Sequence, residues 1–96
     1  MAWVYILECA DLSYYTGSSV DLERRVWEHN EGLGANFTRK RRPVRLVFAE
    51  ESESIETAFL REKQVQGWSR AKKLALIESR WNDLPRLSER RTAEPG

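Results

Sequence analysis

The sequence predicts one α+β domain, a small three-stranded antiparallel sheet with three helices in the order ββαβαα. Three observations support this fold class. Short β-branched and aromatic runs surround turn residues near the N-terminus, and helical start and stop signals follow later. The 96 residues suffice for one hydrophobic core but not for two. We therefore expect one catalytic or binding domain over residues 1–81 and a flexible tail over residues 82–96.

The first two predicted strands form a hairpin. Residues 3–8 are rich in β-branched and aromatic side chains, residues 11–13 supply a turn, and residues 14–18 can return antiparallel. Tyr5 and Tyr15 would then lie on one face of the hairpin as near neighbours. Gly17 would let another backbone or a ligand approach the second strand, unless it is an ordinary strand exit.

The first predicted helix covers residues 21–30, with the aspartate at its start as the cap and glycines beyond its end. On its helical wheel Arg25 and His29 lie beside the apolar stripe, one turn apart, whereas Arg24 and Glu28 face solvent. A cation and an imidazole at the edge of a core suit charge stabilisation and proton handling. Alternatively, Arg25 covers the apolar stripe with its stem and His29 is a satisfied, half-buried histidine.

A basic loop precedes the third predicted strand, residues 44–49. Five cations fall within residues 39–45, which contain no acid, although the whole chain has a net charge of only +1. Such a loop commonly meets a polyanion, and the alternative is a solvated loop with structural arginines. The side chains that we expect to contact nucleic acid are Arg39, Lys40, Arg41 and Arg42.

Glu62 is out of place on the second predicted helix, which begins at Ser52 or Ser54 and ends at Gly67. Its wheel puts Glu62 inside an apolar face made by Ile55, Ala58, Phe59 and Val65. An unpaired buried carboxylate costs several kcal/mol, so Glu62 needs a cation. That cation is either a divalent metal held together with waters and substrate phosphate, or an arginine such as Arg25. A third helix follows, from Ser69 to about Trp81.

Several classes of protein are excluded by composition. No apolar run approaches the roughly 18 residues of a membrane span, and the N-terminus lacks the basic region of a signal peptide. A cytoplasmic location is therefore expected. Cys9 is the only cysteine, so no internal disulfide exists, and we interpret it as a small buried hydrophobe rather than a catalytic thiol.

Five elements in order resemble the signature of the GIY-YIG endonucleases. They are Val4-Tyr5-Ile6, Tyr15-Thr16-Gly17, the run from Asp21 to Arg25, His29, and a glutamate at the position of the family's metal ligand, Glu62. The resemblance covers about residues 2–78 and is closest to the small stand-alone bacterial UPF0213 branch, of which residues 39–44 and 69–73 are also typical. It implies a GIY-YIG-like fold and a divalent-metal-dependent nuclease of low sequence specificity. The implied partner is nucleic acid, DNA more than RNA, together with a repair protein that recruits the domain.

The resemblance also assigns roles. Tyr5 would help to activate the attacking water and Tyr15 would support it, while Arg25 would stabilise the pentavalent phosphate. His29 would assist proton transfer or orient a tyrosine, and Glu62 would bind Mg²⁺ or Mn²⁺. The chemistry is consistent, because a metal and an arginine neutralise charge developing on phosphorus.

Departures from the family pattern leave two other functions open. Val4 replaces the first glycine of the family name and Thr16 its second isoleucine. The asparagine of better-studied members has no evident counterpart, since Asn82 is the only asparagine after Glu62 and is not assigned that role. The rivals are a catalytically idle nucleic-acid-binding module and an interaction domain that docks on a repair complex through its acidic segment, residues 50–56. Keeping tyrosine, arginine and glutamate together favours the nuclease.

Overall fold

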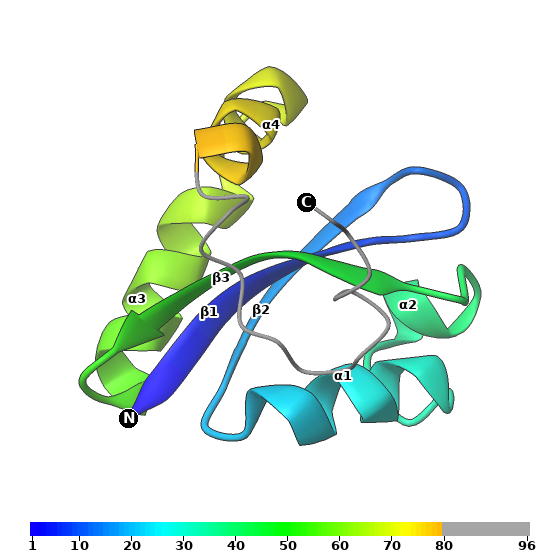
Figure 1. The fold of residues 1–96 in the computed structure, drawn as a ribbon, viewed down its shortest axis with the longest axis horizontal. Helices are drawn as coiled ribbons and strands as arrows, with labels where there is room; N and C mark the ends of the chain where they lie inside the picture. The colour runs from blue at the N-terminus through cyan, green and yellow to red at the C-terminus, as the bar shows by residue number, and fades with distance from the viewer. Residues whose placement is uncertain (80–96) are drawn as a thin grey trace, which may run out of the picture.

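A computed structural model describes residues 1–79 of the chain, and its centre is a three-stranded antiparallel sheet (Figure 1). The strand order is β2-β1-β3, so the first strand is central and the other two are edges. The strands are β1 (Ala2–Glu8), β2 (Tyr14–Ser19) and β3 (Arg45–Ser52). The predicted α+β fold class is confirmed. The predicted end of the domain at residue 81, the tail over residues 82–96 and Asn82 lie outside the described residues.

The third strand is longer than predicted. The prediction covered residues 44–49, but the strand runs from Arg45 to Ser52 because the start of β1 pairs with its end, Ala2 with Ser52. Glu50 and Glu51 are therefore strand residues rather than a lead into the next helix.

Within residues 1–79 four helices surround the sheet, one more than predicted. They are α1 (Leu22–Asn30), α2 (Asn36–Arg39), α3 (Ile55–Gln66) and α4 (Arg70–Ser79). The predicted caps are present, because Asp21, Ser54 and Ser69 each accept a hydrogen bond from a backbone N–H of the following turn. The additional helix, α2, is one short turn that ends at Arg39, where the predicted run of basic residues begins, and no side chain of residues 1–79 caps it. None of the helices in residues 1–79 has the length and apolar character that a membrane-spanning segment requires.

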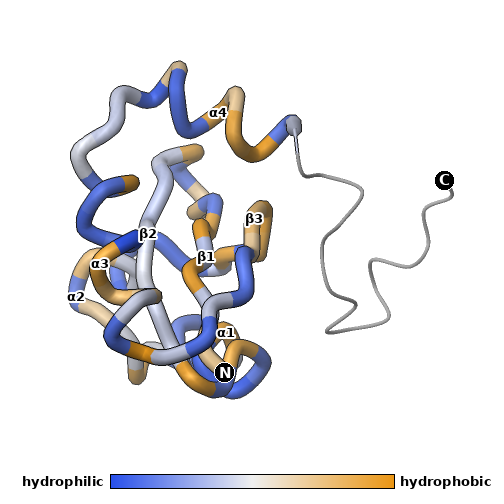
Figure 2. Tube along the Cα trace, turned by 90° about the vertical axis from the view of Figure 1, so that its left-hand side faces the viewer, coloured by the Kyte–Doolittle hydropathy of each residue, from blue (hydrophilic) through white to orange (hydrophobic). Residues whose placement is uncertain are grey.

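Successive side chains of β1 point to opposite faces of the sheet, so the hydrophobic core has one part on each face. On one face Ile6 packs with Val65 of α3 and Ile77 of α4. On the other face Tyr5 and Leu7 pack with residues that include the first residue of α1. Figure 2 shows the hydrophobic parts of β1 and β3 in the middle of the molecule, with α4 above them and α1 below. Cys9 is 3% exposed and belongs to this core, as predicted.

Helix α3 is rotated relative to the predicted wheel. Ala58 and Val65 are fully buried as expected, but Ile55 is 38% and Phe59 48% exposed. Ala58 packs against small side chains of β1, and this close packing turns a different side of the helix toward the sheet. The prediction that Ile55 and Phe59 belong to the core was wrong, and Glu62 consequently lies at the margin of the buried stripe.

Candidate active site

The two tyrosines of the hairpin point to the same side of the sheet. Tyr5 pairs with Gly17 and Leu7 with Tyr15, so Tyr5 and Tyr15 are diagonal neighbours on one face, as predicted. The space over Gly17 is taken by the phenol of Tyr5, since a Cβ added at Gly17 would stand 2.5 Å from the Tyr5 hydroxyl. The absence of a side chain at Gly17 therefore makes room for the phenol of Tyr5, rather than for another backbone or a ligand.

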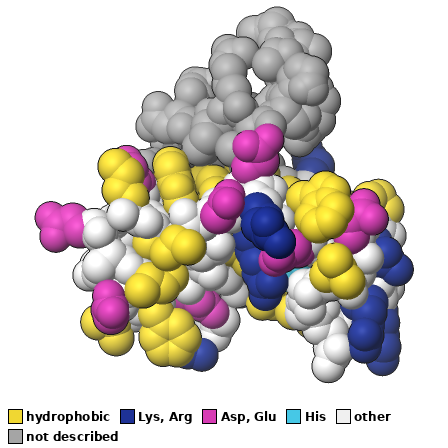
Figure 3. All heavy atoms as spheres, turned by 90° about the horizontal axis from the view of Figure 1, so that it is seen from below, with side chains coloured by type: hydrophobic (Ala, Val, Ile, Leu, Met, Phe, Trp, Pro, Cys, Tyr) yellow, Lys and Arg dark blue, Asp and Glu magenta, His cyan; other side chains and the backbone are white. Residues whose placement is uncertain are grey.

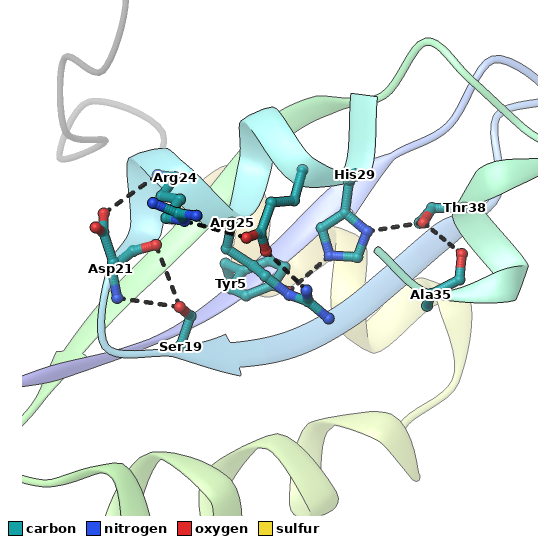
Figure 4. Close-up of polar contacts among 9 residues, drawn as sticks. Tyr5, Ser19, Asp21, Arg24, Arg25, His29, Ala35 and Thr38 are labelled. Carbon is teal, nitrogen blue, oxygen red and sulfur yellow. Dashed lines mark hydrogen bonds and ion pairs between the residues drawn. The ribbon is translucent and has the colours of Figure 1, made fainter. Parts of the chain in front are cut away.

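His29 of α1 meets both tyrosines and is completely buried. Its Nε2 lies 2.9 Å from the Tyr5 hydroxyl, and its Nδ1 lies 2.7 Å from Oγ1 of Thr38 (Figure 4). The ring centroid of Tyr15 lies 5.1 Å from that of His29. Burial, and after it the positive charge of Arg25, lowers the pKa of His29 to about 4. The imidazole is therefore neutral at physiological pH.

Both phenols hold their protons more tightly than usual. Burial raises the pKa of Tyr5 well above its ordinary value, with the Arg25 guanidinium opposing the shift. Burial also raises the pKa of Tyr15, and the negative charge of Glu62 adds to the shift of both tyrosines. Neither tyrosine is a phenolate at neutral pH, and Glu62 is close enough for its charge to act on both.

Arg25 and Arg24 share one carboxylate but differ in exposure. Arg25 lies 2.9 Å and Arg24 3.2 Å from the carboxylate of Glu28, and their side chains are 32% and 70% exposed. The wheel placed Arg24 correctly in solvent. It was wrong for Glu28, whose side chain is only 23% exposed because it bridges the two guanidinium groups.

Glu62 is held by neutral donors. Ser18 Oγ donates to Oε1 at 2.6 Å, and Gln66 Nε2 donates to Oε2 at 2.7 Å. Among the described residues no lysine, arginine or histidine nitrogen lies within 4.0 Å of this carboxylate, so the alternative ion pair with Arg25 is not formed.

The donor set around Glu62 fits a hard divalent cation. No group of three histidine, cysteine, aspartate or glutamate residues that could hold a metal occurs within residues 1–79. A single carboxylate is nevertheless sufficient for Mg²⁺, which keeps several waters and binds substrate phosphate. The hydrogen bonds from Ser18 and Gln66 orient the carboxylate and leave lone pairs on both oxygens.

The predicted phosphate-binding cations are mostly engaged within the protein. Arg39 donates to Asn36 Oδ1 at 2.8 Å and Arg42 to the Arg39 carbonyl at 3.0 Å, while Arg41 pairs with Asp11. Lys40 is exposed. Each arginine keeps further N–H donors, so binding to nucleic acid stays a prediction for these four residues. Figure 3 shows basic and acidic side chains together at the middle of the lower face, and more basic side chains at its right.

Three residues of the site were not identified from the sequence. Gln66 stands four residues after Glu62, a helical spacing that could have indicated the hydrogen bond between them. Ser18 follows Gly17 on β2, and only the actual register brings it to α3. Thr38 carried no signal at all, because it lies in the unpredicted helix α2.

Comparisons with known proteins show which family and which overall fold the chain resembles. A model of the GIY-YIG catalytic domain matches residues 1–75. A UPF0213 protein of Syntrophus aciditrophicus is 49% identical over 77 residues, which cover 79% of this chain and 88% of that protein. A UPF0213 protein of Haloquadratum walsbyi is 49% identical over 76 residues, covering 79% and 85% of the two chains. The solution NMR structure of the UPF0213 protein BH0048 from Bacillus halodurans is similar with a TM-score of 0.55 and 44% identity, covering 84% and 87%.

Proposed function

Because this chain belongs to the GIY-YIG family, we propose that it is a divalent-metal-dependent endonuclease of low sequence specificity that acts on nucleic acid, DNA more than RNA. The observation that carries the proposal is the state of Glu62. Its carboxylate has no cationic partner among residues 1–79, and its charge is felt by the two tyrosines beside His29. A carboxylate kept only for stability would gain from an ion pair with a nearby arginine, whereas a metal ligand must stay open.

The remaining roles follow from position. A divalent ion, Mg²⁺ or Mn²⁺, would neutralise charge on the scissile phosphate. Arg25 would hold the same phosphate from the α1 side, taking its guanidinium partly away from Glu28. Tyr5 would receive the proton of the attacking water, with Tyr15 beside it, and His29 would take part in that transfer. The four cations from Arg39 to Arg42 would bind neighbouring phosphates.

The proposal is tested by incubating the pure protein with labelled single-stranded, double-stranded, branched and nicked substrates in magnesium, manganese or chelator. We expect cleavage of DNA only with a divalent ion. Binding without cleavage under every condition would favour the catalytically idle module instead. Co-purification of a stable repair protein would favour the interaction domain.

Glu62→Gln should abolish the metal-dependent cleavage and leave nucleic-acid binding largely intact, because the charge holds the ion rather than the substrate. Glu56→Gln, on an exposed position of the same helix, is the matched control and should cleave normally. If Glu62→Gln instead lowers the melting temperature and leaves the cleavage rate unaltered, Glu62 is structural and the metal-site hypothesis fails.

A further inference from the structure

The hydroxyl of Thr38 has two neighbours inside the protein. Thr38 is fully buried in α2, and its Oγ1 donates a hydrogen bond to the carbonyl of Ala35 at 3.0 Å. The same oxygen lies 2.7 Å from Nδ1 of His29 (Figure 4). Gly34 packs against the same part of the ring, because an added Cβ would lie closest to Nδ1 and 2.8 Å from Cε1 of His29. Nδ1 therefore faces Thr38 in a closed environment.

Counting protons determines the direction of these bonds. A carbonyl oxygen only accepts, so the single hydroxyl proton of Thr38 is used on Ala35. Thr38 can then only accept from His29, and Nδ1 must carry a proton. In a neutral imidazole the other nitrogen, Nε2, is left with its lone pair, and the Tyr5 hydroxyl must donate to it.

We propose that Thr38 is a positioning residue that fixes His29 as the Nδ1–H tautomer and so makes Nε2 the acceptor for the Tyr5 proton. The proposal rests on the nuclease function inferred above. The opposite tautomer would place an N–H on the Tyr5 oxygen, and Tyr5 could then not pass its own proton to the ring. Thr38 thereby decides whether the tyrosine can act as a base.

The proton transfer balances as follows. Water gives a proton to the Tyr5 oxygen while the phenol proton of Tyr5 moves to His29 Nε2, so Tyr5 stays neutral and His29 is imidazolium only for the short time of the transfer. The resulting hydroxide forms the new bond to phosphorus, and the bond to the leaving sugar oxygen breaks. That oxygen takes the bonding electron pair and a proton from solvent. His29 then returns its proton through Tyr5 to solvent.

Two variants separate this role from simple packing. Thr38→Val keeps the shape but removes the hydroxyl, and Thr38→Ser keeps the hydroxyl. Thr16→Val is the control, because it removes a buried hydroxyl that has no hydrogen-bond partner among the described residues. In single-turnover cleavage we expect Thr38→Val to be slower by about 10²-fold, the lower end for a lost acid–base step, with Thr38→Ser within about threefold of wild type. The protein concentration that gives half of the maximal single-turnover rate should not change.

The tautomer itself is measured by ¹⁵N NMR of the His29 ring at neutral pH, with no substrate or metal. Wild type and Thr38→Ser should show the Nδ1–H form, and Thr38→Val a shift toward Nε2–H. An Nε2–H ring in the wild type overturns the proposal even if no variant folds. Cleavage by Thr38→Val at the wild-type rate also overturns it. If the wild type does not cleave but shows Nδ1–H, the nuclease function fails and the tautomer assignment stands.

Discussion

Arg24 and Arg25 are adjacent in the sequence and share Glu28, yet they should differ in function. Arg25 is the less exposed of the two and lowers the pKa of both Tyr5 and His29, which places its charge at the site. Arg25→Ala should lose about 10²-fold or more in turnover, since preorganised charge stabilisation is of that size. Arg24→Ala should lose little. Turnover at saturating substrate is the appropriate measurement, because both variants also lose one positive charge and bind more weakly.

Equal losses for Arg24→Ala and Arg25→Ala would contradict the assignment. The pair is well matched, because in either variant Glu28 keeps one arginine partner and is not left as an unpaired, half-buried carboxylate. A difference in turnover therefore reports on the site rather than on the stability of α1.

For individual residues, the sequence identified charged side chains that interrupt an apolar helix face. It missed the hydroxyl side chains that form hydrogen bonds to the site. Arg25 and Glu62 could be identified because a charge beside an apolar stripe is costly to desolvate unless it has a partner or a function. Ser18 and Thr38 were not visible, because a hydroxyl is ordinary in a strand or a loop. Their importance comes from partners 44 and 9 residues away in the chain.

Two structural elements are candidates for the main nucleic-acid surface: the loop with α2, and the start of α4. In α4, Arg70 lies over the ring of Tyr14 at 4.3 Å and Lys72 over that of Trp68 at 4.4 Å. Neither forms an ion pair within residues 1–79, unlike Arg41 of the loop.

The loop cations should dominate the salt dependence of binding. The variant with Arg39, Lys40 and Arg41 all changed to Ala should bind every sequence more weakly. It should also flatten the slope of log K against log salt by about two to three, because each phosphate that a cation neutralises adds about 0.7–0.9 to that slope. The matched variant, with Arg70, Lys72 and Lys73 changed to Ala, loses the same charge and should keep most of the slope. If the α4 variant loses more of the slope than the loop variant, the main nucleic-acid surface lies on α4. If the loop variant unfolds, the loop arginines are needed for stability rather than for binding.

The elements themselves were predictable where local signals dominate. Caps and glycine stops defined α1 and α3, and β-branched and aromatic runs on either side of turn residues defined the hairpin. Helix α2 was missed because tertiary interactions hold it: Phe37 stacks on Tyr15 with ring centroids 5.9 Å apart, and Thr38 bonds to His29. The rotation of α3 was missed for a similar reason, since a wheel ranks Ile55 above Ala58 by hydrophobicity but the sheet accepts the smaller side chain.

For the whole molecule, buried neutral His29 makes stability depend on pH. Its pKa is about 4 in the folded protein and about 6.5 when unfolded. Above pH 6.5 neither state is protonated there and His29 has no effect. As the pH falls from 6.5 to 4, the unfolded chain binds a proton that the folded protein refuses, so the free energy of unfolding decreases. The full loss, on the order of 3 kcal/mol, is reached below pH 4.

Urea unfolding at pH 7.5 and pH 4 measures this loss, and His29→Gln supplies the comparison because glutamine does not titrate. Carboxylates such as Glu28, whose pKa is lowered by Arg25, also reduce stability in acid and do so in both proteins. The wild type should therefore lose more stability than the variant over the same interval. Parallel losses would mean that His29 is not buried as a neutral ring.

One glutamine connects the chemistry of the site to self-association. Besides holding Glu62, Gln66 Nε2 also lies 3.3 Å from the backbone carbonyl of Thr16, on the edge strand β2. An edge carbonyl without a partner is a template on which a strand from another molecule can add. The side-chain amide of Gln66 donates to this carbonyl and so gives it a partner within the same chain. A replacement that removes this amide, such as Gln66→Leu, would release both Glu62, the proposed metal ligand, and the carbonyl of Thr16, so one change would affect cleavage and intermolecular strand pairing together.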